Sequence, residues 1–571
     1  MKNKIENLIQ EALKKLSIEN IEIILEHPNN LNNGDFTTNI AMVCAKKLEM
    51  SPIEIAKKIV DILNENKPEE IEKIEVAHPG FINFYLSKKY FIENTEKILK
   101  EKENYGKGEN LKGQTVLVEY TDPNPFKLFH TGHLMTNAVG EAISRIIEWN
   151  GALIKRLCYQ GDVGLHVAKT IWGIKNDPEW KEKFEEIKNS SITEKIAWLG
   201  EAYSKGALSY EDNEDSINDI NKKIYEKTDE EVNELYDLGK KWSLEYFDQI
   251  YKKLGTKFDH NFFESEAAPI GQKLVEENIG GVFEKSDGAI IFKGENYGLH
   301  TRVFINSEGL PTYEAKELGL AKMKGEKYSF DKSIIITGNE VNDYFKVLLK
   351  VMELILPDYA LKTKHISHGM LRLPSGKMSS RTGQVVTAES LIDGVKKIIF
   401  KKLEDRDFNE DEKEKIAEQV SIGAIKFSIL KQSIGKDIIF DFEKSLSFEG
   451  DSGPYLQYSF ARANSVLEKA KKLGMKIEIP ALRNLGEAGD LEKVINQFPN
   501  IVERAGNEYA PNYLITYLLE LVSAFNAYYR DNKIIDTENK ESSYRLALTE
   551  AFKTTLENGL NILGIPNPER M

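Results

Sequence analysis

The sequence predicts a multidomain chain: a small α+β module, an α/β domain built on a parallel sheet, and an all-helical bundle. Three observations support this prediction. The 571 residues exceed what one hydrophobic core usually holds, roughly 250 to 300 residues. Strand and helix patterns alternate in the middle of the chain, as in parallel sheets, and the last third shows helical periodicity with almost no strand pattern. We place the domains at residues 1–108, 109–404 and 405–571.

The middle domain opens with a strand, a loop and a helix. The strand Val116–Tyr120 leads through the proline-rich loop TDPNPFKLF into a helix expected from about Thr131 to Trp149. The charged helical stretch 175–254 is expected to be an insertion. The further strand candidates, which we expect to alternate with helices in one parallel sheet, are Leu153–Tyr159, Ala289–Lys293, Thr301–Ile305 and Ser333–Thr337.

The two flanking regions carry different patterns. Up to residue 108, helical patterns alternate with two short apolar strands, one of them within His78–Leu86. A polar boundary at Asp405–Lys415 precedes helical periodicity from about Ile416 to Met571. We therefore expect an α+β module before the α/β domain and a helical bundle after it.

Composition narrows the possible classes of protein. The chain is 41% hydrophobic and 29% charged, as in ordinary soluble proteins, and its apolar runs are too short to span a membrane. Met1–Lys15 lacks the apolar core of a signal peptide, so we expect a cytoplasmic protein. The only two cysteines, Cys44 and Cys158, cannot supply a zinc site of several thiolates, and we expect no zinc or other metal-ligand site. Because the net charge is -14, a nucleic acid would need local basic surfaces.

The motif His130-Thr131-Gly132-His133 lies where the loop after the first strand enters its helix. The two histidines are three residues apart and share a helix face. Free backbone N–H groups and the helix dipole favour an anion there, so a phosphate would fit. Gly132 leaves room for a nucleotide to approach the backbone. In isolation, the motif could equally be a capping loop with incidental histidines.

A second motif, Lys377-Met378-Ser379-Ser380-Arg381, follows the last strand candidate. Its cations, hydroxyls and flanking glycines suit a loop that grips a triphosphate, although alone it could be any solvated basic turn. Together and in this order, the two motifs resemble the HIGH and KMSKS elements of class I aminoacyl-tRNA synthetases. The resemblance implies a Rossmann-like catalytic domain that activates an amino acid with ATP.

Amino-acid activation is attack of a carboxylate on the α-phosphate of ATP, so it needs positioning and charge stabilisation more than a protein nucleophile. We expect the histidines to donate hydrogen bonds to phosphates and the loop cations to neutralise them, with Mg²⁺ entering as Mg-ATP. Ser380 replaces the family's usual second lysine, and Lys127 could supply that charge. The implied catalytic and ATP-binding residues are Lys127, His130, Gly132, His133, Lys377, Met378, Ser379 and Arg381.

A narrower resemblance, to arginine-tRNA ligases, covers nearly the whole chain. Glu119, Asn124, Lys127, His130 and His133 match that family's E-x4-N-x2-K-x2-H-x-G-H pattern residue by residue. The resemblance implies an N-terminal module that contacts the tRNA elbow and a C-terminal anticodon-binding domain. The terminal segments that carry it are Gly34–Phe36, Gly80–Phe84, Gly453–Arg462, Ala524–Tyr529 and Pro568–Met571.

The resemblance also implies an arginine site. Glu119 follows a central strand, where α/β sheets bind ligands, and could hold a guanidinium through two hydrogen bonds. Two positions depart from the family: Glu317 replaces an aspartate and Val341 replaces a glutamine. The alternative for this pair is a salt-bridged helix glutamate and a packed valine. The implied arginine-binding residues are Glu119, Asn124, His130, Tyr313 and Glu317.

Candidate tRNA contacts lie mainly in the helical domain. Aromatic, amide and cationic side chains read unpaired bases by stacking and edge hydrogen bonds, although tyrosines at helical spacing more often pack in a core. Asp162 and His166 resemble a family element beside the active site and are peripheral candidates. The candidate tRNA-binding residues are Asn83, Tyr455, Gln457, Tyr458 and Arg462.

The sequence therefore predicts an enzyme that ligates L-arginine to tRNA(Arg) through an arginyl-adenylate. The resemblance implies a monomer that needs bound tRNA for activation, and no membrane partner is expected. One alternative is a class I synthetase with altered amino-acid specificity. A second is a catalytically silent tRNA-binding paralogue, and a third is a nucleotidyltransferase of the same superfamily, which would leave the terminal modules unexplained.

Overall fold

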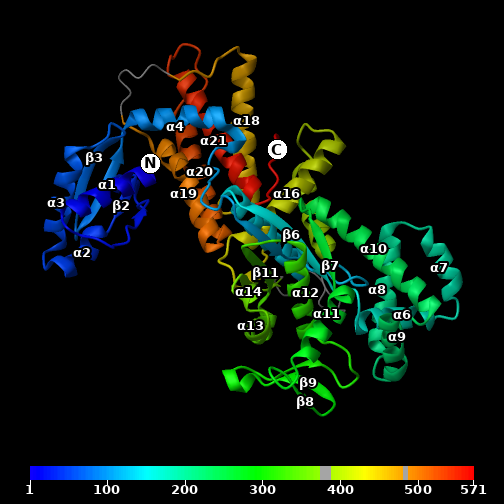
Figure 1. Cartoon of the computed structure of the whole chain (residues 1–571). Coiled ribbons are helices and arrows are strands. Elements are labelled where there is room, and N and C mark those ends of the chain that lie inside the picture. The colour runs from blue at the N-terminus through cyan, green and yellow to red at the C-terminus, as the bar shows by residue number, and fades with distance from the viewer. Residues whose placement is uncertain (373–386, 480–486) are drawn as a thin grey trace.

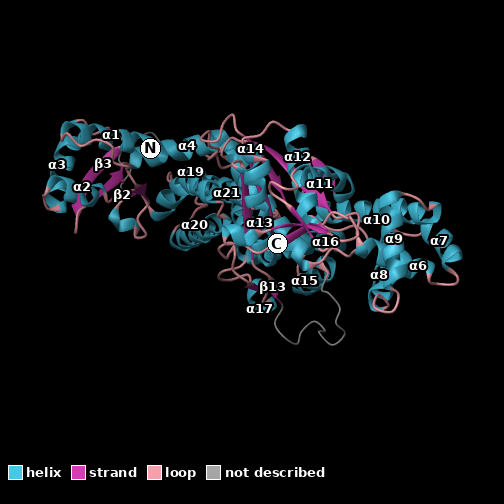
Figure 2. Ribbon diagram, turned by 60° about the horizontal axis from the view of Figure 1, so that its bottom comes forward, coloured by secondary structure: helices cyan, strands magenta, loops and turns pink. Residues whose placement is uncertain are grey.

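The computed structural model describes residues 1–372, 387–479 and 487–571. The molecule is elongated: the N-terminal module and the insertion helices lie at opposite ends of a central sheet (Figure 1 and Figure 2). The C-terminal helices lie between the N-terminal module and that sheet. None of the described helices is long and apolar enough to cross a membrane.

The N-terminal module is a four-stranded antiparallel sheet, in the order β1-β2-β4-β3, that shares an apolar core with three helices. Two strands were predicted here; β1 and β2 are only two and three residues long, too short to show a periodic pattern. The elements are α1 (Lys2–Lys15), β1 (Leu25–Glu26), β2 (Phe36–Thr38), α2 (Ile40–Leu48), α3 (Pro52–Glu65), β3 (Ile71–Ala77) and β4 (Phe81–Leu86).

Helix α4 leaves this module and lies against two C-terminal helices, α19 and α21. The Lys88 ammonium pairs with the buried Glu492 carboxylate at 2.6 Å, and the Tyr90 hydroxyl donates to Asn496 at 3.0 Å. These contacts join the first and last parts of the chain. The three helices are α4 (Lys88–Glu101), α19 (Asp490–Glu508) and α21 (Ser542–Ile562).

The middle of the chain is built on a parallel five-stranded sheet, in the order β12-β11-β5-β6-β7. Its central strand β5 is buried on both faces: Val116 and Val118 pack with α5, and Leu117 packs with α11 and α12. Burial on both faces explains why β5 is a continuous apolar run. The bounds are β5 (Thr115–Glu119), α5 (Thr131–Trp149), β6 (Leu153–Gln160), β7 (His260–Phe263), α11 (Glu264–Glu277), α12 (Tyr313–Lys327), β11 (Lys332–Gly338), α13 (Asn342–Ile355), α14 (Pro357–Ala360) and β12 (Thr363–His368).

The predicted strands over 289–293 and 301–305 do not join this sheet, so that part of the prediction is wrong. They form a separate antiparallel sheet, in the order β10-β9-β8, because the link 293–301 is shorter than the dozen residues a parallel crossover needs. The places in the parallel sheet belong to β7, which has only four residues, and to β12, whose sequence TKHISH is mostly polar; neither strand was predicted. The separate strands are β8 (Glu284–Ser286), β9 (Ala289–Phe292) and β10 (Arg302–Ile305).

A helical insertion lies between β6 and β7, and its first helix starts before the predicted residue 175. The buried Asp162, just after β6, attaches it to the sheet. The Asp162 Oδ2 accepts hydrogen bonds from the Lys240 ammonium at 2.7 Å and the Tyr236 hydroxyl at 2.8 Å, and its Oδ1 accepts from the Ser265 N–H at 2.9 Å. The helices are α6 (Leu165–Lys175), α7 (Trp180–Lys188), α8 (Ile192–Leu208), α9 (Glu214–Glu226) and α10 (Glu230–Leu254).

The remaining elements are helical apart from a two-residue strand pair, β13 with β14. Asn409 and Glu412 form a capping box that fixes the start of α16 within the predicted polar boundary. The elements are β13 (Leu371–Arg372), α15 (Ala388–Lys402), α16 (Glu410–Leu430), β14 (Ile438–Ile439), α17 (Phe442–Ser445), α18 (Gly453–Lys472) and α20 (Pro511–Asp531).

We predict that Asp162→Ala lowers the free energy of unfolding by about 3–5 kcal/mol. Removal of this buried carboxylate leaves the Lys240 ammonium and the Tyr236 hydroxyl without their acceptor. The thermal midpoint should fall, and limited proteolysis should cut first within the insertion helices.

The matched control is Asp177→Ala in the same insertion. Asp177 pairs with Lys183 at 2.8 Å on the surface, where an ion pair contributes little to stability. The control should keep the wild-type midpoint, and an Asp162→Ala protein with that same midpoint would contradict the prediction.

Candidate active site

The loop from Tyr120 to His130 joins the carboxyl end of β5 to α5. Thr121, Asp122 and Phe126 have left-handed backbones, with φ of 80°, 46° and 68°. Such conformations cost of order 1–3 kcal/mol each and persist where the surroundings hold them. The loop lies in the crevice at the carboxyl ends of parallel strands, where α/β sheets bind ligands.

Neighbouring elements hold this loop through its polar groups. The Tyr159 N–H, at the end of β6, donates to the Asp122 carboxylate at 2.7 Å. The Phe126 N–H donates to the Ser243 hydroxyl of α10 at 2.9 Å, and the Phe126 ring is buried. The strained loop is thus fixed by the sheet on one side and by the insertion on the other.

His130 and His133 lie at the start of α5 with their rings stacked, 3.6 Å between centroids. The Gly132 N–H donates to the His130 Nδ1 at 3.0 Å, and the His130 N–H donates to the His133 Nδ1 at 3.3 Å. An imidazole nitrogen that accepts from a backbone N–H carries no proton, so a neutral ring carries its proton on Nε2. Both rings therefore present an Nε2–H donor.

Burial keeps both rings neutral. It lowers the pKa of His130, with a smaller lowering from Lys127 that Glu340 partly opposes. It lowers the pKa of His133 further, and His130 and Lys127 add to that shift. At neutral pH the pair thus donates hydrogen bonds without placing two positive charges side by side.

Gly132 and Lys127 shape the approach to this pair. A Cβ on Gly132 would lie 2.8 Å from the His130 ring, so glycine allows that ring to fold over the helix start. The Lys127 ammonium lies 5.5 Å from the centre of the Tyr203 ring of α8. Burial, and then Lys169, lowers the pKa of Lys127, while Glu264 opposes the shift. The motif therefore has one adjacent cation from its own loop.

Three carboxylates gather around one ammonium beside β5. Glu119 is buried and forms an ion pair with Lys324 of α12. Burial and repulsion from Glu119 raise the pKa of Asp122 well above its usual value, and the same two causes raise the pKa of Glu317. Lys324 opposes both shifts without cancelling them. This acidic cluster suits a cationic ligand.

Asn124 and Glu264 converge on the backbone of Gly161. A Cβ at Gly161 would lie 2.2 Å from the Asn124 Oδ1 and 3.1 Å from the Glu264 Oε1. The Glu264 Oε2 pairs with the buried Lys316 ammonium at 2.7 Å. Glu264 was not predicted as a site residue because it follows β7, a strand of only four residues. Asp122, Lys316 and Lys324 were not predicted either, although Asp122 stands two residues after the predicted first strand.

Helix α12 places Tyr313 and Glu317 one turn apart at the same edge. Tyr313 is exposed, and its carbonyl oxygen accepts a bond from the Tyr344 hydroxyl at 3.3 Å. Glu317 is half-buried within the acidic cluster. Val341 packs against an apolar cluster that includes Phe345. The structure thus brings Glu119, Asn124, Tyr313 and Glu317 to one edge of the sheet, near the His130 turn.

The second motif, Lys377 to Arg381 with Met378 and Ser379, lies outside the described residues. Among the residues that are described, no group of three or more histidine, cysteine, aspartate or glutamate side chains could hold a metal ion. Both cysteines are buried as free thiols.

Tyr455, Tyr458 and Arg462 lie on α18, next to α20. The Arg462 guanidinium donates to Asn526 at 2.7 Å and stacks over the Tyr458 ring, 4.8 Å from its centre. The Tyr455 hydroxyl accepts from Asn526 at 2.9 Å, and all three side chains are partly exposed. We call Tyr455, Tyr458, Arg462 and the exposed Tyr529 the α18–α20 patch.

Two other predicted tRNA contacts are buried inside the protein. Gln457 is fully buried, and its amide donates to the carbonyl oxygens of Gln419 and Pro566 at 3.0 and 2.6 Å. Asn83 accepts from the Thr37 hydroxyl at 2.7 Å within the N-terminal sheet. In this structure both side chains contact protein.

The two peripheral candidates, Asp162 and His166, contact the backbone and the helices that surround the site. Asp162 anchors the insertion, as described above. His166 lies within hydrogen-bond distance of the Gly161 carbonyl, 2.8 Å away, and burial lowers its pKa to about 3. Together they fix the Gly161 backbone on which Asn124 and Glu264 converge.

Three regions of the chain match known domain families. Residues 94–442 match the family described as tRNA synthetases class I (R), catalytic domain. Residues 3–86 match the arginyl tRNA synthetase N terminal domain, and residues 456–571 match the DALR anticodon binding domain.

Relatives that match over their full length are arginine-tRNA ligases. The chain is 33% identical to an arginine-tRNA ligase of Clostridioides difficile, with 99% of each chain covered. It is 34% identical to an arginine-tRNA ligase of Treponema denticola, with 98% of this chain and 96% of that one covered.

Solved structures show the same architecture. The arginyl-tRNA synthetase of Thermus thermophilus aligns over the full length of both chains, with a TM-score of 0.78 and 25% identity. That of Plasmodium falciparum, at 22% identity, shares the fold with a TM-score of 0.80 over 100% of this chain and 99% of its own. The protein described here belongs to the arginine-tRNA ligase family of class I aminoacyl-tRNA synthetases.

Proposed function

We propose that this protein ligates L-arginine to tRNA(Arg) with ATP, through an arginyl-adenylate. The observation that carries the proposal is the close placement of two different sites at one sheet edge. The His130 turn presents two neutral donors to an anion, and the acidic cluster around Glu119 favours a cation. A nucleotide phosphate and a guanidinium fit these two sites.

The nucleotide site acts by positioning and by stabilising charge. The Nε2–H groups of His130 and His133 donate to phosphate oxygens, and Lys127 adds one positive charge nearby. Lys377 and Arg381 complete the binding of the triphosphate, with contacts from Met378 and Ser379, and Mg²⁺ supplies further neutralisation as Mg-ATP. In the first step, the arginine carboxylate attacks the α-phosphate and pyrophosphate leaves.

The amino acid lies between β5 and α12. Glu317 and Tyr313 face the guanidinium from α12, while Asn124 and His130 contact the amino-acid end that reacts. Glu119 supports the negative potential from behind, since its carboxylate is already paired with Lys324. The two oxygens of the Glu317 carboxylate match the fixed fork of a guanidinium better than they match other cations.

The tRNA binds to the helical side of the molecule. Stacking of unpaired anticodon bases on the tyrosines of the α18–α20 patch, with Arg462 nearby, suits single-stranded RNA. The N-terminal module, joined to the bundle through α4, contacts the tRNA elsewhere. The 2'-hydroxyl of the terminal ribose then attacks the arginyl-adenylate. We expect the enzyme to work as a monomer in the cytoplasm.

We predict that arginine is the only amino acid that the wild type attaches to total tRNA. The measurement is aminoacylation with each labelled amino acid in turn. Glu317→Asp, which restores the family's residue, should keep arginine as the substrate. Charging of a different amino acid by the wild type would reject the proposal.

We predict that the KM for arginine falls as the pH rises from about 6 to about 9. The pKa of Glu317 is raised in the empty site, so part of the population is protonated at the low end. A guanidinium pairs only with the ionised carboxylate. Steady-state kinetics across this range would show the trend.

Glu317→Gln should raise the KM for arginine and remove its dependence on pH in this range. The control is Glu326→Gln, an exposed glutamate on the same helix, which should behave as wild type. An unchanged pH dependence in Glu317→Gln would show that another group controls arginine binding.

We predict that Tyr458→Ala and Arg462→Met each raise the KM for tRNA about tenfold or more, since stacking contributes about 1–3 kcal/mol per base. The KM for arginine should stay within about twofold of wild type. Arg530→Met serves as control, because Arg530 pairs with its neighbour Asp531 on the surface. Equal effects in the control and in Arg462→Met would argue against the α18–α20 patch.

A further inference from the structure

A polar contact joins the end of β12 to the first turns of α5. His368 is the last residue of β12, and its Nε2 lies 2.7 Å from the Thr136 Oγ1. The same oxygen lies 3.0 Å from the carbonyl oxygen of Gly132. His368 and Thr136 are both buried. The contact therefore reaches the turn that carries His130 and His133.

The hydrogen-bonding groups define the direction of this contact. The His368 Nδ1 lies 2.7 Å from the Gly369 carbonyl, which can only accept, so Nδ1 carries a proton. Burial lowers the pKa of His368, although Gly369 and Glu340 oppose the shift, and the ring is neutral at pH 7. Its Nε2 is then an acceptor. The Thr136 hydroxyl donates to this nitrogen at 2.7 Å and lies farther, at 3.0 Å, from the Gly132 carbonyl oxygen.

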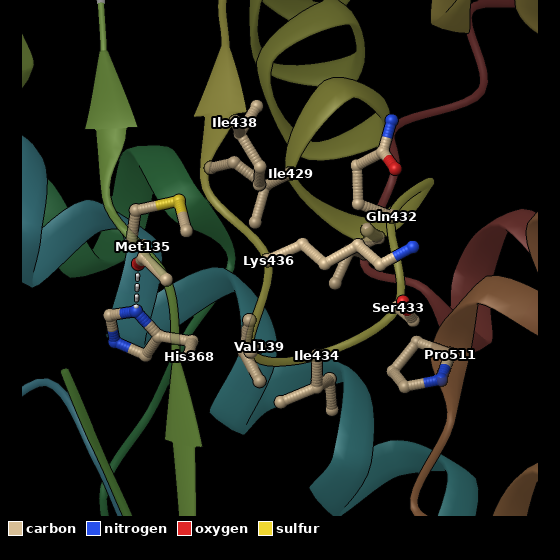
Figure 3. A pocket seen from close by; sticks show the side chains of 13 residues that line it. Met135, Val139, His368, Ile429, Gln432, Ser433, Ile434, Lys436, Ile438 and Pro511 are labelled. Atoms are coloured by element: carbon tan, nitrogen blue, oxygen red, sulfur yellow. Dashed lines mark hydrogen bonds between the residues drawn. The ribbon is translucent and has the colours of Figure 1, made fainter. Parts of the chain in front are cut away.

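The backbone around His368 is fixed from the opposite side. A Cβ on Gly369 would lie 2.3 Å from the Lys436 backbone, and the Met370 N–H donates to the Asp437 carboxylate at 2.9 Å. A pocket that is partly open to solvent, and is lined in part by His368, Gly369 and Lys436, lies next to these contacts. Figure 3 shows His368 on one side of it, beside Met135 and Val139 of α5. The backbone just after His368 is therefore held against residues 436 and 437.

We infer that His368 is a positioning residue for the ATP site. By accepting from Thr136, it holds the first two turns of α5, and with them the His130 and His133 rings, against the end of β12. It touches neither ATP nor arginine and acts through Thr136. The inference rests on the proposed function only in taking the His130 turn as the phosphate site.

The physical reason lies in what ties α5 to β12. Without His368, the Thr136 hydroxyl is left with the Gly132 carbonyl, one turn back in its own helix, and a bond within the helix cannot hold that helix against β12. The turn that carries both donors would then be free to shift. Misplacement of about 1 Å near a reacting centre can cost 100-fold in rate.

Four variants test the inference: Thr136→Val, which keeps the shape and removes the hydroxyl; Thr136→Ser, which keeps the hydroxyl; His368→Leu; and the double variant Thr136→Val/His368→Leu. The readouts are arginine-dependent exchange of pyrophosphate into ATP, with tRNA present, and calorimetric binding of a non-hydrolysable ATP analogue. We expect Thr136→Val and His368→Leu to weaken analogue binding and raise the KM for ATP about tenfold. The KM for arginine should stay within about twofold, and Thr136→Ser should match wild type.

The same strand provides a matched control. His365 also lies on β12, and its Nε2 is 2.7 Å from the Thr337 hydroxyl on the neighbouring strand. It does not contact α5 through that bond. His365→Leu and Thr337→Val should lower the thermal midpoint about as much as the test variants, yet keep the wild-type affinity for the ATP analogue. Circular dichroism verifies that each variant is folded.

The outcomes separate the inference from the proposed function. If the double variant binds the ATP analogue as tightly as His368→Leu does, the two residues act as one unit, as inferred. Normal analogue binding by Thr136→Val, failure of Thr136→Ser to match wild type, or equal losses in the His365 control would each overturn the inference. A wild type that binds the analogue but shows no arginine-dependent exchange would overturn only the proposed function.

Discussion

The strained loop between β5 and α5 is the constraint on which the rest of the site depends. Three non-glycine residues with left-handed backbones would relax if the loop were free. The sheet holds it through Tyr159, and the insertion holds it through Ser243. Because Asn124, Lys127 and His130 all belong to this loop, their mutual positions are fixed before any substrate arrives. A site that acts by positioning requires this preorganisation.

The two sides of this loop favour ligands of opposite charge. On one side, burial keeps the stacked histidines neutral, so the turn presents dipoles and donors to a polyanion. On the other side, Glu119, Asp122 and Glu317 repel one another with only Lys324 between them. A bound guanidinium would supply the positive charge that this cluster favours. Under the proposed function, the two substrates meet where the anion-binding turn adjoins the acidic cluster.

Local signals in the sequence predicted the elements that carry the candidate site better than they predicted the fold's longer-range strand pairings. The bounds of α5 agree with the prediction, because a strand, a turn and a periodic helix follow one another there. The strand β7 was missed because four residues are too few to show a pattern, and β12 because its mostly polar sequence has no apolar alternation. Glu264 was missed with β7. The antiparallel pairing of β9 with β10 follows from the short link over residues 293–301, which the strand pattern alone does not take into account. Gln457 was predicted from its side-chain type and helical spacing, and these do not show which helix face is buried.

Helix α5 connects the chemistry to the RNA-binding side of the molecule. Its first turn carries the two histidines, and near its other end Arg145 donates to the carbonyl oxygens of Gly255 and Asn561, at the ends of α10 and α21. Lys426 of α16 binds the carbonyls of Leu254 and Gly564 at the ends of the same two helices. Cations at helix carboxyl ends are favourable because they meet the negative end of the helix dipole. The helical bundle is thus attached to the same rigid element that orients the phosphate site, so α5 sets the distance between a tRNA bound to the bundle and the reacting phosphate.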